Sequence, residues 1–183
     1  MIISRRHGIT LLGAAIATPT LALAQTDPRA PALPPALATL SAVPITTPQG
    51  AATTLSAHLA AAPSVIAFWA TWCSPCLLEG RQLADIRNRV PAERLNIIGV
   101  NMDANREPRR LQRFMERARM NYTQVFGTMR LYRAFNNPGE GTQVLLPRLY
   151  IFAADGSPVA AFGSYDGEGA IEEIDRAVNG VLV

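Results

Sequence analysis

The two cysteines of the chain, Cys73 and Cys76, are the residues whose type and spacing most directly suggest chemistry. They lie in the segment FWATWCSPCLLEG (68–80), where an apolar strand-like run meets the expected first turn of a helix. Residues i and i+3 of a helix place their Cβ atoms about 5 to 6 Å apart, and a small adjustment of the turn closes that gap to disulfide distance. A reversible redox pair can therefore form here without refolding.

A structural disulfide and half of a metal site are the alternative interpretations of this pair. A bridge that spans so few residues removes little loop entropy from the unfolded chain, so it stabilises the fold weakly. Zinc needs about four Cys or His ligands. Besides the two cysteines, the chain after residue 24 contains one histidine, His58. The sequence therefore favours a redox pair that needs neither a metal nor an organic cofactor.

The two thiols are expected to differ in reactivity. Cys73 falls at the expected N-terminus of a helix, where unpaired N–H groups and the helix dipole stabilise a thiolate near neutral pH. Cys76, one turn further, is expected to be more buried and less acidic. Pro75 fits the first turn, where no hydrogen bond exists for it to break. This asymmetry provides an attacking and a resolving thiol, the two roles that thiol–disulfide exchange requires.

The hydrophobic pattern predicts the elements that position this pair. Apolar runs indicate buried strands at 63–70 and 94–102, a helix from about residue 74 and a second helix at 107–120. Two strands around a turn at 148–163 and a helix at 169–179 complete the chain. The first half alternates as in a parallel sheet and the second half contains a hairpin. We therefore expect an α/β fold with a central mixed β-sheet flanked by helices on both faces.

Specific side chains are expected to face the core from these helices. In the first helix they are Leu77, Leu78, Leu83, Ile86 and Val90, and in the last helix they are Ile171, Ile174 and Val178. The second helix carries or adjoins six arginines, which we interpret as a solvated face rather than a docking surface for an acidic partner. They are Arg106, Arg109, Arg110, Arg113, Arg117 and Arg119.

The first 49 residues differ in character from the rest. Residues 1–24 combine Arg5 and Arg6 with an apolar stretch and small residues before Gln25, which predicts an export signal of the Tat-like or Sec type. Its roughly 16 apolar residues fall short of the ~20 that a spanning helix needs, so we expect cleavage rather than a membrane tether. Residues 25–49, rich in Pro and Ala, predict an extended arm or linker, and 50–183 a single domain.

Charge and composition exclude several classes of function. The formal net charge of +3 falls to +1 when the two arginines of the signal are removed, so no nucleic-acid partner is expected. All 17 basic residues are arginines, which excludes a catalytic lysine. With 49% hydrophobic and 17% charged residues, the chain is expected to fold by itself, as a monomer.

The segment FWATWCSPC after a buried strand, with this order of elements, resembles the thioredoxin superfamily. The pattern C-x-x-C-x-x-E in an exported chain resembles its TlpA-like branch of periplasmic thiol–disulfide oxidoreductases. The resemblance covers about residues 50 to 180 and includes IIGVNMD for the second central strand and LPRLYIFAADG for a proline followed by a strand. It implies a thioredoxin-like fold.

The resemblance also implies roles for individual residues. Cys73 would be the solvent-facing nucleophile and Cys76 the resolving thiol, with Trp72 packed beside them. Pro147 would be a cis-proline that faces the disulfide, and Leu146 before it would offer backbone groups to a substrate strand. An ordinary trans-proline at the start of an edge strand is the alternative for Pro147.

Two further positions, Glu79 and Arg148, carry alternatives. Ala67 stands where thioredoxin has a buried aspartate, so Glu79 would have to move protons to and from the resolving thiol. Otherwise, Glu79 is a solvated first-turn residue favoured by the helix dipole. Arg148 replaces the usual threonine after the cis-proline. It either lowers the pKa of Cys73 and selects acidic substrates, or points into solvent.

The resemblance implies that the chain is a periplasmic reductase of protein disulfides. A membrane protein would supply its electrons, and apocytochrome c or copper-site assembly factors are candidate substrates. A peroxidase of the same fold, using Thr71 and Arg148 beside one cysteine, is an alternative. A non-enzymatic copper chaperone is another, although it would want a C-x-x-x-C pair and a well-placed histidine.

Overall fold

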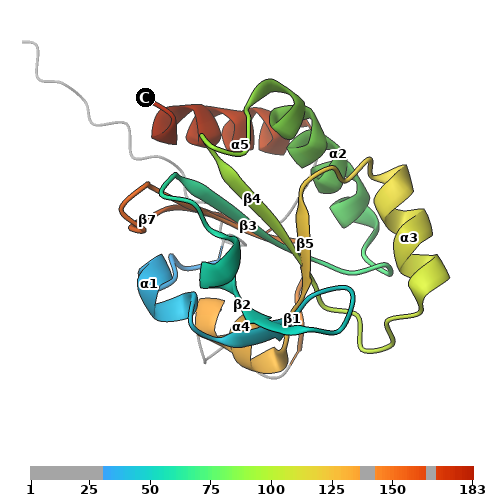
Figure 1. The fold of residues 1–183 in the computed structure, drawn as a ribbon. Coiled ribbons are helices and arrows are strands. Elements are labelled where there is room, and N and C mark those ends of the chain that lie inside the picture. Colours follow the sequence, from blue (N-terminus) through green and yellow to red (C-terminus); the bar gives the residue numbers. More distant parts are fainter. Residues whose placement is uncertain (1–30, 137–142, 164–167) are drawn as a thin grey trace, which may run out of the picture.

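A seven-stranded sheet forms the centre of the molecule in the computed structural model, which describes residues 31–136, 143–163 and 168–183 (Figure 1). Its strand order is β2-β1-β5-β4-β3-β6-β7. The strands are β1 (Pro44–Thr46), β2 (Ala52–Thr54), β3 (Ser64–Trp69), β4 (Asn96–Asn101), β5 (Thr123–Phe126), β6 (Arg148–Phe152) and β7 (Pro158–Phe162). The helices are α1 (Leu37–Leu40), α2 (Ser74–Arg89), α3 (Pro108–Arg117), α4 (Met129–Phe135) and α5 (Glu168–Val181), with a 3-10 turn at Leu55–His58.

The sheet is mixed, as the sequence predicts. Strands β3, β4 and β5 run parallel, while β6 and β7 form an antiparallel hairpin beside β3. Every residue of β3 and β4 is buried, which explains why both strands appear in the sequence as nearly continuous apolar runs. The hairpin turns at Gly156, whose φ of 81° suits a residue without a side chain.

Two hydrophobic cores cover the two faces of the sheet. Alternate residues of β3 point to opposite faces, so Ile66 and Phe68 lie in one core and Val65 and Ala67 in the other. Helices α1 and α4 close the first core, and α2 and α5 close the second, as the layers of Figure 1 show. These findings confirm the expected α/β architecture with helices on both faces.

The segment expected as an extended arm at 25–49 is partly folded, and that prediction is wrong for residues 37–46. Helix α1 buries Leu37 and Leu40 in the first core, and β1 buries Ile45 while it pairs with both β2 and β5. The prolines concealed this, because the two elements are only three and four residues long and show no periodicity. The expected signal at 1–24 lies outside the described residues.

Strands β2 and β5 and helix α4 were also not predicted, and two expected core residues are exposed. Strand β5 and helix α4 are short, and their core contacts come from isolated residues such as Val125 and Leu131. Leu78 of α2 and Ile171 of α5 point to solvent, contrary to expectation. Within the described ranges, no helix is long and apolar enough to cross a bilayer.

Candidate redox site

The two cysteines form a disulfide at the N-terminus of α2. Cys73 is the N-cap residue, and its Sγ accepts a hydrogen bond from the backbone N–H of Cys76 at 3.3 Å. Pro75 occupies the first turn, as expected. Cys76 is completely buried, whereas Cys73 retains a small exposed fraction of 4%. The predicted helix start is confirmed, whereas Cys73, which the resemblance implies to face solvent, is itself nearly buried.

The tryptophan that packs with the cysteines is Trp69, the last residue of β3. It lies with Cys73 and Cys76 in a third hydrophobic cluster and stacks on Phe114 of α3, with ring centroids 5.0 Å apart. Trp72 exposes 54% of its surface, so much of its side chain lies in solvent beside Cys73 in the chain. Trp69 was missed because its alternation in β3 marked it only as a core residue.

A buried carboxylate holds the loop that leads into the redox pair. Asp103, just after β4, accepts hydrogen bonds from the backbone N–H of Thr71 at 3.0 Å and from its hydroxyl at 2.9 Å. The amide of Asn101 donates to the same carboxylate at 2.7 Å. Sequence reasoning missed this contact, because the two segments are 32 residues apart and meet only through the parallel pairing of β3 and β4. Asp103 therefore fixes the backbone two residues before Cys73.

Glu79 is buried against the second core. It is only 3% exposed, so the alternative of a solvated first-turn glutamate is wrong. Desolvation raises the pKa of Glu79 to about 8. The pKa of Tyr122 is also raised, by its own burial and by the charge of Glu79. Since Ala67 offers no acid in this core, Glu79 provides an ionisable group there, one turn after Cys76.

The segment before β6 reaches the same site from the other side. The Leu146–Pro147 peptide bond is cis, as the resemblance implies, and Leu146 packs against the cluster that contains both cysteines. Arg148 is 4% exposed, and its guanidinium donates to the carbonyl of Gly163 at 3.4 Å. The solvent-facing alternative for Arg148 is therefore wrong, and little of its guanidinium surface is available to a substrate.

The structure thus brings four predicted site residues together, namely Cys73, Cys76, Leu146 and Pro147, with Glu79 buried one turn along the helix. His58 lies apart from them, in the turn after β2, where its ring contacts the hydroxyl of Thr53 at 3.2 Å. Across the described ranges, no group of three or more His, Cys, Asp or Glu residues is placed to hold a metal ion.

Solved structures similar to this chain share its fold. A secreted disulfide oxidoreductase of Mycobacterium tuberculosis, homologous to E. coli DsbE, has a TM-score of 0.60 at 20% identity and covers 77% of this chain and 96% of its own. A thioredoxin-family thiol:disulfide interchange protein of Chlorobium tepidum has a TM-score of 0.62 at 22% identity, covering 84% and 97%. The thioredoxin domain of a Bacteroides vulgatus thiol-disulfide oxidoreductase has 0.57 at 19%, covering 82% and 98%.

These likenesses confirm the thioredoxin-like fold. No curated protein matches the chain in sequence. A family match extends over residues 38–158, which is more than half of the chain and includes the redox pair and the cis-proline. On this evidence the chain belongs to the AhpC/TSA family.

Proposed function

We propose that this protein is an exported thiol–disulfide oxidoreductase that reduces disulfides in other proteins. The observation that carries the proposal is the Cys73–Cys76 disulfide at the N-terminus of α2, with Cys73 at the cap and Cys76 buried behind it. A helix N-terminus stabilises a thiolate at the cap, and burial disfavours one at the second position. The pair therefore has distinct attacking and resolving members.

The reaction starts from the reduced pair. The Cys73 thiolate attacks one sulfur of the substrate disulfide, forming a mixed disulfide, and the other substrate sulfur leaves as a thiolate that takes up a proton. The Cys76 thiol then loses its proton and attacks Cys73. This step forms the Cys73–Cys76 disulfide and releases the second substrate sulfur. Two electrons pass from the enzyme to the substrate, and a dithiol donor must return them.

Glu79 is suited to exchange a proton with Cys76. Burial raises the pKa of Glu79 to about 8, which is far closer to the pKa of a thiol than an ordinary carboxyl group is. A smaller difference in pKa lowers the driving force that proton transfer from the buried Cys76 thiol needs. Because Glu79 follows Cys76 by three residues on the same helix, both side chains lie on the same side of α2.

We assign substrate contacts to the residues around the entrance. Trp72 offers an exposed indole next to Cys73, and Leu146 offers backbone groups beside Pro147. Arg148, the first residue of β6, contributes a buried positive charge next to Pro147 rather than a direct contact with the substrate. The substrates are proteins that contain disulfides, and apocytochrome c or copper-site assembly factors are the candidates.

We place the protein in the periplasm, with residues 1–24 as its export signal and a membrane protein as its electron donor. An oxidising compartment lets the Cys73–Cys76 disulfide persist until that donor reduces it. The electron donor supplies the two electrons that each catalytic cycle consumes.

The reduction potential of the pair tests the direction. Purified protein is equilibrated with glutathione or dithiothreitol buffers, and free thiols are trapped and counted. A value near that of thioredoxin, about −270 mV, supports a reductase, whereas a value near −120 mV indicates a disulfide donor. Failure to form a reversible disulfide refutes the proposal. Rapid consumption of hydrogen peroxide by the reduced protein would favour the peroxidase instead.

A further inference from the structure

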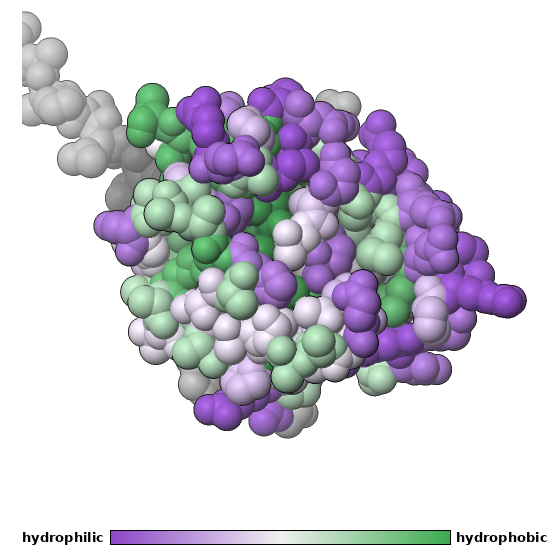
Figure 2. Space-filling model, in the orientation of Figure 1, coloured by the Kyte–Doolittle hydropathy of each residue, from purple (hydrophilic) through white to green (hydrophobic). Residues whose placement is uncertain are grey.

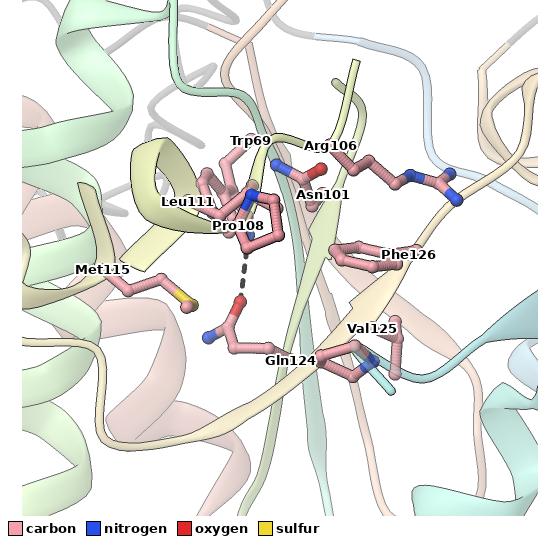
Figure 3. A pocket seen from close by; sticks show the side chains of 10 residues that line it. Trp69, Asn101, Arg106, Pro108, Leu111, Met115, Gln124, Val125 and Phe126 are labelled. Atoms are coloured by element: carbon pink, nitrogen blue, oxygen red, sulfur yellow. Dashed lines mark hydrogen bonds between the residues drawn. The ribbon is translucent and has the colours of Figure 1, made fainter. Parts of the chain in front are cut away.

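An apolar pocket lies beneath α3, beside the redox site. Its volume is about 160 Å³. Figure 3 shows Met115, Pro108, Leu111 and Phe126 around it, with the side-chain amide of Gln124 at one edge. That amide accepts a hydrogen bond from the Trp69 indole at 3.0 Å, the dashed line in Figure 3. Nothing in the redox mechanism uses this pocket.

The pocket opens at the same edge of the sheet as the thiols. Trp69, Asn101 and Phe126 end β3, β4 and β5, and they pair in one row across the three parallel strands. All three line the pocket. Cys73 follows Trp69 by four residues, at the carboxyl end where ligands of α/β sheets bind. A protein attached to Cys73 therefore lies close to this opening.

The volume and the apolar lining of the pocket suit an apolar side chain of a bound protein. A cavity of about 150 Å³ lined by apolar groups accommodates a benzene molecule, so 160 Å³ accommodates one Leu, Met or Phe side chain. Met115 and Phe126 are only partly buried, so burying them against such a side chain is favourable. Trp69 lines the pocket and also packs in one hydrophobic cluster with Cys73 and Cys76, so it connects the pocket with the redox pair.

One positive charge lies at the rim. Arg106 lines the pocket, and its guanidinium stands over the Phe126 ring at 4.5 Å and donates to the carbonyl of Gly127 at 2.7 Å. Its Nε is buried and has no hydrogen-bond partner among the described residues. The lining contains no carboxylate. An acidic residue next to the inserted side chain would therefore complement the rim.

We propose that this pocket recognises the protein substrate through one apolar side chain, flanked by an acidic residue that pairs with Arg106. The inference rests on the proposed oxidoreductase function and specifies its substrate class: protein segments with an apolar and an acidic residue at a set distance from the reactive cysteine. Binding energy gained here holds the substrate disulfide at Cys73 during attack.

Trapped mixed disulfides test this recognition. The Cys76→Ser protein is reduced and offered a peptide library in which a central cysteine carries a 2-thiopyridyl disulfide and four random residues stand on each side. The Cys73 thiolate displaces the pyridine thiolate, which takes up a proton to become pyridine-2-thione, and a Cys73–peptide disulfide forms. Without Cys76 the adduct persists and its peptides can be sequenced.

We expect roughly tenfold enrichment of Leu, Met or Phe at one fixed offset from the cysteine, with Asp or Glu beside it. Met115→Trp, which fills the pocket, removes the apolar preference, and Arg106→Gln removes only the acidic one. Pro48→Phe fills the pocket from the β1–β2 turn and serves as a second test if Met115→Trp does not fold. The control Arg109→Gln changes an exposed arginine of α3 outside the pocket and keeps both preferences.

Two results would overturn the inference while the redox function stands. One is efficient trapping of peptides without any positional preference. The other is an apolar preference that survives in both folded pocket-filling variants. Failure of the Cys76→Ser protein to trap any peptide would instead refute the redox function, and this inference would fall with it.

Discussion

Helices α2 and α3 pack against each other near the disulfide, yet they differ in which of their side chains are buried. In α3, Leu111 and Phe114 are buried and its arginines point to solvent, so Figure 2 shows hydrophilic residues gathered over that helix. In α2, two neighbours are inverted, because Leu78 is 49% exposed while Glu79 is 3% exposed. The amphipathic pattern predicts α3 correctly and fails in α2 where the helix carries chemistry.

Local capping contributes to the same contrast. The carboxylate of Glu107 accepts hydrogen bonds from the N–H groups of Arg109 and Arg110, so the N-terminus of α3 is satisfied by its own side chain. At the N-terminus of α2 the cap is Cys73, whose sulfur accepts a hydrogen bond from the backbone N–H of Cys76. An unusual cap and a buried acid on one helix mark a functional site, whereas α3 has an ordinary structural pattern.

Replacing the cap of α2 should have the largest effect. Cys73→Ser is expected to lower disulfide reductase activity at least about a thousandfold, since no other nucleophile can form the mixed disulfide. Activity is measured with a protein disulfide and dithiothreitol as the electron source. Arg113→Gln on α3 is the control and should keep wild-type activity. Substantial activity in Cys73→Ser would contradict the role given to the cap.

The buried acid should make stability depend on pH. The pKa of Glu79 is about 8 in the folded protein and 4.5 as a free side chain. The stabilisation of the fold by the neutral carboxyl is therefore complete below pH 4.5 and is lost as the pH rises to about 8. The free energy of unfolding of wild type, measured with urea, should therefore fall by about 4 kcal/mol over this pH interval relative to that of Glu79→Gln. Glu116→Gln, at an exposed position of α3, should show the same dependence of stability on pH as wild type. Parallel curves for wild type and Glu79→Gln would show that the carboxyl is not desolvated.

The inner face of α3 should matter more than its arginines. Phe114→Ala removes the ring stacked on Trp69 and should lower the free energy of unfolding by about 3 kcal/mol. Arg113→Ala on the outer face should change it by less than about 0.5 kcal/mol. Urea unfolding, followed by tryptophan fluorescence, measures both. Equal effects would mean that the stacked pair contributes little to packing.

The smallest effect is expected at Leu78. Leu78→Gln should change the free energy of unfolding by less than about 0.5 kcal/mol, because the side chain is already half exposed. Leu83→Ala, on the buried face of the same helix, should cost about 3 kcal/mol. Urea unfolding distinguishes the two. A large loss at Leu78 would mean that its surface contacts another part of the protein.

The central part of the fold was predictable because its signals are local and strong. Strands β3 and β4 are nearly continuous apolar runs, and an Asp-Gly turn joins β6 and β7. The helix that begins after Cys73 follows from Pro75 and the spacing of the cysteines. These features depend on neighbours within a few residues, which a single sequence contains.

The missed elements share the opposite property. Helix α1 and strand β1 are stabilised by partners far away in the chain, such as β5 and the first core, rather than by periodicity of their own. Strand β5 likewise takes its place from pairing with β4. Short segments carry too few residues to show a period, so only long-range packing selects their conformation.

The sequence by itself determined the redox pair, its place at a helix N-terminus and the α/β class, because spacing and local propensity are sufficient for these. Only the tertiary structure decided that Glu79 is buried, that Asp103 holds Thr71, that Trp69 packs with the thiols while Trp72 is exposed, and that a pocket opens beside them. Burial and side-chain contact arise where segments distant in the chain pack together. A pattern within one segment does not contain that information.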